Sequence, residues 1–257
     1  MTAHPFRLLG QSGFRLVING IVVYMDPYLS NSVQELDSPD LERLIPVPIQ
    51  PDEVSDADFV LISHVHIDHC DPQTIPSLAE SSPHCQFIGP KPVVEKLMTW
   101  GIEGDRCSIA EEDWMDLGRD LKIVAVPAAH PEITRDSNGN LSAVGFVLEI
   151  SGKRCYMAGD TSIEDELLDR LHGLKPISFA LLPVNEHNYY RGRRNIVGNM
   201  SVRDAFGLAE EIGISLVVPV HWDMFAANSV SPDEIMAIYR QIKPRFDLEM
   251  NPAAITL

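Results

Sequence analysis

The feature that most constrains this chain is a histidine-rich segment between a strand-like run and a turn signal. Four side chains that commonly bind metals fall within six consecutive positions: His64, His66, Asp68 and His69. The mostly apolar residues 58–62 before them favour a buried strand, and Asp71-Pro72 after them is typical of a helix start. A loop between two such elements can aim several side chains at one point. The segment therefore predicts a metal site.

The same arrangement recurs further along the chain. Strand-like runs end just before His130, before Gly159-Asp160 and before His221. Each of these alone has an ordinary alternative, since Asp160 could cap the following helix and His130 could lie on the surface. Because all of them follow a strand end, as the first segment does, we expect them to converge on one site.

The order of the expected elements indicates an α/β fold. Strands are expected at 6–9, 14–18, 21–25, 58–62, 86–88, 121–126, 143–150, 153–157, 179–184 and 216–220. Helices are expected at 72–80, 91–100, 162–172, 201–212 and 232–242. Two β-rich blocks, each followed by helices, predict two sheets packed face to face with helices outside, a four-layer αββα sandwich. No domain boundary interrupts the pattern, so residues 1–257 are interpreted as one domain, with 30–57 as a long surface excursion that lines the site.

Composition excludes several kinds of partner. A net charge of −17 repels phosphate backbones and anionic membranes, so we expect neither nucleic acid nor membrane binding. No stretch approaches the roughly 18 apolar residues of a membrane span, which indicates a cytoplasmic protein. The four cysteines are widely spaced, as reduced thiols are: Cys70, Cys85, Cys107 and Cys155. Cys70, next to the histidine segment, is either an additional ligand or a buried filler.

The motif order H-x-H-x-D-H, His, Gly-Asp, His resembles the metallo-β-lactamase superfamily over nearly the whole chain. The resemblance implies a hydrolase that holds two divalent cations. It implies the following ligands: His64, His66 and His130 for one ion, Asp68, His69 and His221 for the other, with Asp160 between them. It also implies that Asp26, in Met25-Asp26-Pro27, braces the metal loop from behind.

A narrower resemblance is to the branch of lactonases that open L-ascorbate 6-phosphate. The residues that carry it are Phe87-Ile88-Gly89-Pro90-Lys91, Trp100-Gly101-Ile102, Arg106-Cys107, Gly198-Asn199-Met200-Ser201 and His221-Trp222-Asp223-Met224-Phe225. This branch implies manganese, although histidine and carboxylate ligands also suit zinc and iron. The chain departs from the branch in its shorter length and in carrying His130, so the substrate does not transfer directly.

The predicted function is hydrolysis of a small anionic ester, with a phosphorylated sugar lactone as the leading substrate. Two cations can lower the pKa of water from 15.7 toward about 7, and Asp68 is the catalytic candidate that orients this nucleophile and moves its proton. Six further residues are candidates to contact or support the substrate: Asn185, Arg191, Arg193, Arg194, Asn199 and Asp223. The arginines are equally compatible with salt bridges or a subunit contact.

Other functions remain open from the sequence. A small-molecule phosphodiesterase, of the cyclic-nucleotide type, would use the same two ions. Di-iron oxidoreductases share the scaffold but usually carry a glutamate where this chain has His66. A non-catalytic metal-binding protein is the remaining alternative, and a homo-oligomer is compatible with each of them.

Overall fold

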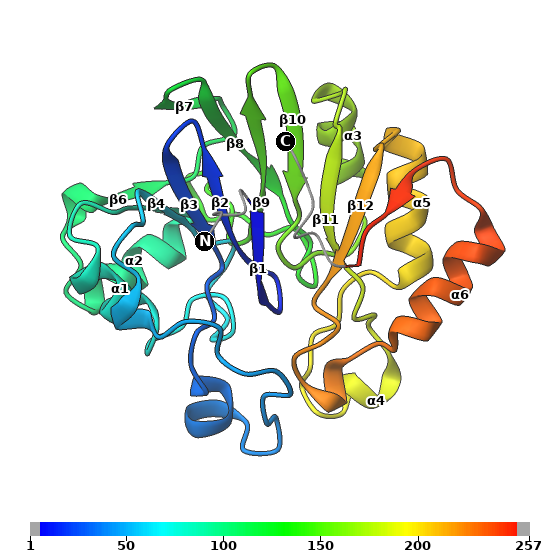
Figure 1. Cartoon of the computed structure of the whole chain (residues 1–257), viewed down its shortest axis with the longest axis horizontal. Coiled ribbons are helices and arrows are strands. Elements are labelled where there is room, and N and C mark those ends of the chain that lie inside the picture. Colours follow the sequence, from blue (N-terminus) through cyan, green and yellow to red (C-terminus); the bar gives the residue numbers. More distant parts are fainter. Residues whose placement is uncertain (1–5, 251–257) are drawn as a thin grey trace.

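The strands of the computed structural model, which describes residues 6–250, form two sheets (Figure 1). Within that range the sheet orders are β1-β2-β3-β4-β5-β6 and β13-β12-β11-β10-β9-β8-β7. The first sheet contains β1 (Phe6–Gly10), β2 (Gly13–Ile18), β3 (Ile21–Met25), β4 (Phe59–Leu61), β5 (Gln86–Gly89) and β6 (Cys107–Ile109). The second contains β7 (Met115–Gly118), β8 (Leu121–Pro127), β9 (Val144–Ile150), β10 (Lys153–Met157), β11 (Phe179–Pro183), β12 (Leu216–Val220) and β13 (Asp247–Leu248).

Each sheet joins an antiparallel half to a parallel half. Strands β1, β2 and β3 form an antiparallel meander, and β3 to β6 run parallel. In the second sheet β7 to β10 are antiparallel, and β10 to β13 run parallel. Parallel strands end at the same edge of a sheet, so the loops after β3 and β4 gather together, as do those after β10, β11 and β12. Strands β6, β7 and β13 were not predicted from the sequence.

The sheets face each other across a shared core. The Phe6 ring lies 5.3 Å from the Phe14 ring in its own sheet and 5.7 Å from the Phe179 ring in the other. Phe146 is also fully buried between the sheets. Each such side chain contributes about 1.5–3 kcal/mol when it leaves water, so the contact between the sheets is a main source of stability.

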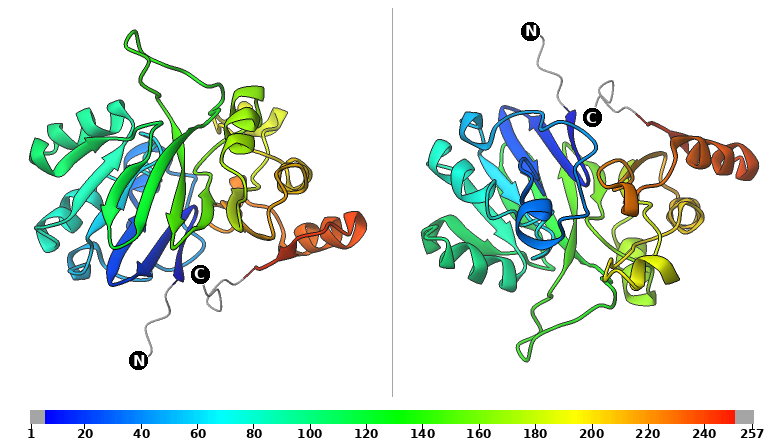
Figure 2. Two further views of the ribbon diagram at one scale, coloured as in Figure 1. Left: turned by 90° about the horizontal axis from the view of Figure 1, so that it is seen from above. Right: turned by 90° about the horizontal axis from the view of Figure 1, so that it is seen from below.

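Helices cover both outer faces (Figure 2). The helices are α1 (Ile75–Ser81), α2 (Lys91–Thr99), α3 (Asp165–Gly173), α4 (Tyr189–Gly192), α5 (Val202–Ile212) and α6 (Pro232–Ile242). Leu78 of α1 and Val93 of α2 pack on the first sheet. Leu167 of α3, Phe206 of α5 and Ile235 of α6 pack on the second. The predicted four-layer αββα sandwich is confirmed.

Two of the predicted helix starts are wrong. Helix α1 begins at Ile75 rather than at 72, because the Asp71 carboxylate accepts hydrogen bonds from Gln73 N at 2.9 Å and Ser30 Oγ at 2.6 Å. Asp71 thus stabilises a turn before the helix and is not its N-cap. Helix α3 begins at Asp165 rather than at 162, because Ser162 N donates to Ala129 O at 2.7 Å and this bridge keeps the backbone extended.

The excursion between β3 and β4 folds back over the ends of the strands. It contains the short π-helical turn η1 (Val33–Asp37) and the 3-10 turn η2 (Pro51–Glu53). The Arg43 guanidinium anchors it by donating to the carbonyl oxygens of Tyr28 and Ser30, at 2.9 and 3.2 Å. In Figure 1 this blue segment lies below the sheets, and Arg43 forms a β-bridge with Phe225 of the orange segment that follows β12.

Two further expectations concern membranes and cysteines. None of the helices described between residues 6 and 250 is long and apolar enough to cross a membrane.

All four cysteines are free thiols. Cys70 is fully buried, and burial raises the pKa of its thiol to about 12. In the described part of the chain it belongs to none of the groups that could hold a metal ion, so its role is that of a buried filler.

Candidate metal centre

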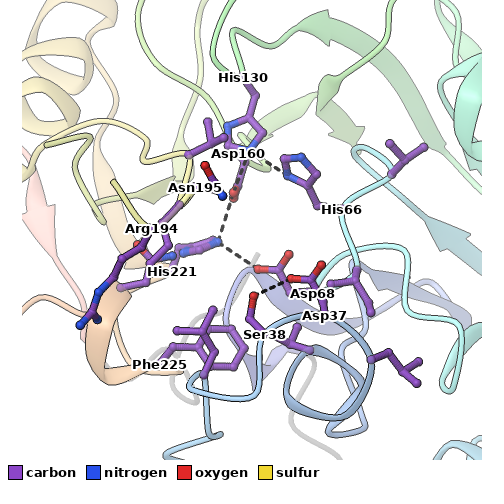
Figure 3. Close-up of a pocket in the computed structure, with 18 of the residues that line it drawn as sticks. Asp37, Ser38, His66, Asp68, His130, Asp160, Arg194, Asn195, His221 and Phe225 are labelled. Atoms are coloured by element: carbon purple, nitrogen blue, oxygen red, sulfur yellow. Dashed lines mark hydrogen bonds and ion pairs between the residues drawn. The ribbon is translucent and has the colours of Figure 1, made fainter. Parts of the chain in front are cut away.

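Five loops at one end of the sandwich bring the metal-type side chains together. They follow β3, β4, β8, β10 and β12 and carry Asp26, residues 64–69, His130, Asp160 and His221. Figure 3 shows the side chains that line the pocket facing one another across it. The fold therefore places at one point residues that are far apart in the sequence.

The first group of donors consists of His64, His66 and His130. His66 Nδ1 lies 2.9 Å from His64 Nε2 and 3.1 Å from His130 Nε2. Burial lowers the pKa of His130 to about 4, so its imidazole is neutral at neutral pH, the form that binds metals. His66 is exposed to solvent, whereas His64 is buried. This group is open on one side.

The second group consists of Asp68, His69 and His221. Asp68 Oδ2 lies 3.5 Å from His221 Nε2 and 3.7 Å from His69 Nε2. Both imidazoles are buried. Within each group the donor atoms lie within 4.8 Å of one another, close enough to be bound to a single ion.

Asp160 lies between the two groups. Its Oδ2 is 3.2 Å from His221 Nε2 and 3.6 Å from His130 Nε2, and its Oδ1 is 3.3 Å from His69 Nε2. The preceding Gly159 makes this possible. It has a φ of 61°, and a Cβ there would lie 2.6 Å from Ser63 Cβ. A carboxylate in this position can be shared between two ions.

The electrostatics of the cluster favour ionised carboxylates. Burial would raise the pKa of Asp160, but His221 and His69 hold it well below its usual range. Burial would likewise lower the pKa of His221, but the carboxylates of Asp160 and Asp68 raise it to about 9. Burial would also raise the pKa of Asp68, but His69 and His221 hold it below its usual range, so both aspartates are charged at neutral pH, as carboxylate ligands must be. An ion that binds His221 displaces the proton that this imidazole carries in the metal-free protein.

The residues present fit divalent cations. His69 Nε2 and Asp160 Oδ1 are buried and make no hydrogen bond with any residue between 6 and 250. Buried polar atoms are nearly always satisfied, so two orphaned atoms that face each other need a further partner. A donor set of imidazole nitrogens and carboxylate oxygens suits zinc, manganese or iron. The roles of the individual ligands stay predictions.

Asp26 holds the second group from behind. Its Oδ1 accepts from Ser63 N at 2.7 Å, and its Oδ2 accepts from Ser63 Oγ at 2.6 Å. Oδ2 also lies 2.8 Å from His69 Nδ1, with both side chains fully buried. When His69 Nδ1 donates to this carboxylate, Nε2 is left with a lone pair toward the cluster. This geometry is the one expected of a bracing residue.

Gln11, in the turn between β1 and β2, also reaches the cluster and was not predicted. Its Nε2 donates to Asp68 Oδ2 at 2.5 Å and lies 3.0 Å from His221 Nε2. Its backbone is fixed as well, since its carbonyl accepts from His221 N at 2.9 Å and its N–H donates to Asp223 Oδ1 at 3.3 Å. Gln11 thus links two predicted ligands, and Asp223 holds Gln11.

The predicted substrate arginines have different surroundings. The Arg191 guanidinium donates to the carbonyl oxygens of Glu186, Ala227 and Ser229, so it braces loops and is not among our proposed substrate contacts. Arg193 is exposed and does not line the pocket. Arg194 does line it, and in Figure 3 its side chain extends toward the rim, away from the histidines.

The predicted asparagines form a buried chain that supports the site. Asn199 Nδ2 donates to Asn185 Oδ1 at 2.9 Å, and Asn185 Nδ2 donates to Asn228 Oδ1 at 3.1 Å. Of these three, Asn228 lines the pocket, and it was not predicted. Asn185 and Asn199 therefore tie together the loops around the pocket.

An αββα sandwich with a histidine and aspartate cluster at its strand ends defines a class of metal-binding proteins. The chain belongs to the β-lactamase superfamily domain family, whose sequence model matches residues 22–222. This match confirms the resemblance to the metallo-β-lactamase superfamily.

Similar proteins carry related descriptions. An uncharacterised protein of Mycobacterium tuberculosis is 30% identical over 220 residues, which are 84% of this chain but 58% of that protein. A probable L-ascorbate-6-phosphate lactonase of Salmonella is 24% identical over 230 residues, 82% of this chain and 61% of that protein. The chain thus spans less than two thirds of these relatives.

Two further comparisons cover nearly full lengths. A metal-dependent hydrolase of Pyrococcus abyssi is 26% identical over 254 residues, 95% of this chain and 98% of that protein. The structure of a metallo hydrolase from Ignicoccus hospitalis has a TM-score of 0.70 at 20% identity, covering 96% of this chain and 94% of that one. The structural likeness supports the fold.

Proposed function

We propose that this chain is a metal-dependent hydrolase of small anionic esters, with lactones as the first substrates to test. The observation that carries the proposal is the cluster itself: two members of each group of donors, and Asp160 between the groups, line a cavity of about 670 Å³. Ligand sites commonly have about 300–1,000 Å³. The relatives described as a lactonase and a metal-dependent hydrolase support the same class of reaction.

Divalent cations, when bound, supply Lewis acidity and lower the pKa of water to about 7. The chain's own residues position the reactants. In the hydrolysis, the oxygen of water bonds to the acyl carbon, the ester C–O bond breaks, and the leaving oxygen takes a proton. Asp68 is the proposed carrier of that proton, because its carboxylate lines the pocket and Gln11 fixes its orientation.

Arg194 is the proposed contact for the anionic part of the substrate. Its guanidinium lies at the rim, where a carboxylate or phosphate could bind it through two hydrogen bonds while the ester lies at the cluster. Lys96 also lines the pocket, but its Nζ donates to Val65 O at 2.9 Å. A phosphorylated sugar lactone is one substrate with the required charge.

The test is hydrolysis by protein that has been stripped of metal and reloaded with manganese or zinc. The panel contains L-ascorbate 6-phosphate, uncharged and carboxylated lactones, and cyclic phosphodiesters. We expect metal-dependent lactone opening that falls at least about 100-fold in Asp68→Asn. The matched control is Asp120→Asn, an exposed aspartate in the turn between β7 and β8. Cleavage of the diesters alone would replace the proposal with a phosphodiesterase, and no turnover with metal bound would reject hydrolysis.

A further inference from the structure

One part of the lining of the cavity beside the cluster is apolar. Six side chains form what we call the apolar wall: Val33, Leu36, Leu41, Ile67, Val197 and Phe225. They come from the excursion after β3, from the histidine loop, from the loop after α4 and from the segment after His221. Segments far apart in the sequence therefore place apolar groups next to the proposed reaction site.

The apolar wall is built in advance of any ligand. Val33 and Phe225 are 2% and 3% exposed and form a hydrophobic cluster with Tyr28 and Met224. The Tyr28 and Phe225 rings lie 6.1 Å apart, and Leu41 packs against the same cluster. A surface backed by packed side chains keeps its shape, so it can bind an apolar group without first being ordered.

Ser38, Asp37 and Asn228 in the lining already have hydrogen-bond partners within the chain. Ser38 Oγ donates to Asp37 Oδ2 at 2.8 Å, and Asn228 Oδ1 accepts from Asn185 at 3.1 Å. A substrate rich in hydroxyl groups would have to compete with these bonds. An apolar substituent would gain free energy by leaving water for the apolar wall.

Leu36 is the most exposed member of the apolar wall. Its side chain is 61% exposed although it lines the cavity on η1. Together with the partly exposed Leu41, Ile67 and Val197, it gives the apolar wall a surface that a ligand can cover. The polar side chains of the neighbouring Asp37 and Ser38 bond to each other, so Leu36 is the residue of this turn whose side chain is left to contact a ligand.

We propose that the substrate carries an apolar substituent of several carbons, which lies on the apolar wall while its ester lies at the metal cluster. The inference rests on the proposed hydrolase function and narrows its substrate class. It predicts that alkyl-substituted lactones are better substrates than hydroxyl-rich sugar lactones of the same charge.

The experiment compares carboxylated γ-lactones that differ only in the length of their alkyl chain, with a carboxylated, hydroxyl-rich sugar lactone of the same charge as the polar substrate. We expect kcat/KM to rise about fourfold for each of the first few methylenes, which corresponds to about 0.8 kcal/mol per buried methylene. Leu36→Ser and Val197→Ser should flatten this dependence. The matched control is Leu44→Ser, since Leu44 is 55% exposed on the same excursion but does not line the cavity.

A dependence on chain length that is flat or falling, or faster turnover of the sugar lactone, would overturn the inference while leaving hydrolysis intact. If no ester is turned over, the proposed function fails. The apolar wall is then tested on its own, by measuring the binding of carboxylates of different chain length. Calorimetric titration of butyrate, hexanoate and octanoate into the metal-loaded protein should then show affinity that rises with length and falls in Leu36→Ser. Equal affinities for the three carboxylates would reject the apolar wall as a binding surface.

Discussion

The two groups of proposed ligands differ in how the fold holds them. His69 and His221 are 0% and 2% exposed, and Asp26 and Gln11 contact them from within the protein. His66, in the other group, is exposed and lies against His64 and His130. The comparison suggests that the buried group is preorganised by the chain, whereas the open group is completed by the ion that it binds.

The aspartate shared by both groups gives the largest expected effect. In Asp160→Ala the contacts to His130, His69 and His221 disappear together. Bound metal should fall from two ions to one or none, and turnover should fall by at least about 100-fold. Metal analysis and kinetics measure both, with Asp165→Ala, an exposed change at the start of α3, as the control. Two ions retained at full affinity would mean that Asp160 is not shared.

The support behind the buried group gives the next effect. Asp26→Ala leaves His69 without its buried partner and removes the acceptor of two bonds from Ser63. We expect the free energy of unfolding of the metal-free protein to fall by about 3 kcal/mol, and metal affinity by about 10–100-fold. Urea denaturation and metal titration measure these changes.

A surface ion pair provides the control for Asp26. Glu166 bonds Arg135, and the two side chains are 50% and 31% exposed, so Glu166→Ala should lower the free energy of unfolding by about 1 kcal/mol or less. If the free energy of unfolding fell equally in the two variants, Asp26 would not be what holds the buried group in place.

Whether a feature could be predicted from the sequence depends on whether local or distant contacts determine it. The metal-type residues were predictable because four lie in one loop and the others follow directly after strand ends. Most strands and helices were predictable because hydrophobic runs, and helix caps such as Ser201 with Asp204, act locally. What depends on distant contacts was not predictable.

Gln11 and Arg191 illustrate this limit from opposite sides. Gln11 contacts residues 57 and 210 positions away, and its Gly-Gln-Ser-Gly surroundings indicate only a turn. Arg191 has the chemistry of an anion contact, but the fold places carbonyl oxygens around it. The apolar wall likewise exists only after the excursion has folded over the strand ends.

Gln11 allows a finer test of the buried group. Asparagine tolerates the φ of 57° at this position but is one methylene too short to span Asp68 and His221. Gln11→Asn should therefore weaken metal binding about tenfold with little change in unfolding. Calorimetric titration of metal into the metal-free protein measures the affinity. The control is Gln73→Asn, because the Gln73 side chain bonds Glu35 at the surface. Unchanged affinity would show that Gln11 only closes the turn.

The smallest expected effect is on the stability of the metal-free protein when a residue of the open group is replaced. Because His66 is exposed, His66→Ala should change the free energy of unfolding of the metal-free protein by no more than about 0.5 kcal/mol. It should nevertheless remove one bound ion, since His66 Nδ1 lies between His64 and His130. His69→Ala should remove an ion and also destabilise the metal-free fold, because Asp26 would then be buried without its histidine. Urea midpoints and metal content measured on both variants separate the two groups. If His66→Ala destabilised the metal-free protein as much as His69→Ala, both groups would be parts of one rigid framework, and ion binding would complete neither.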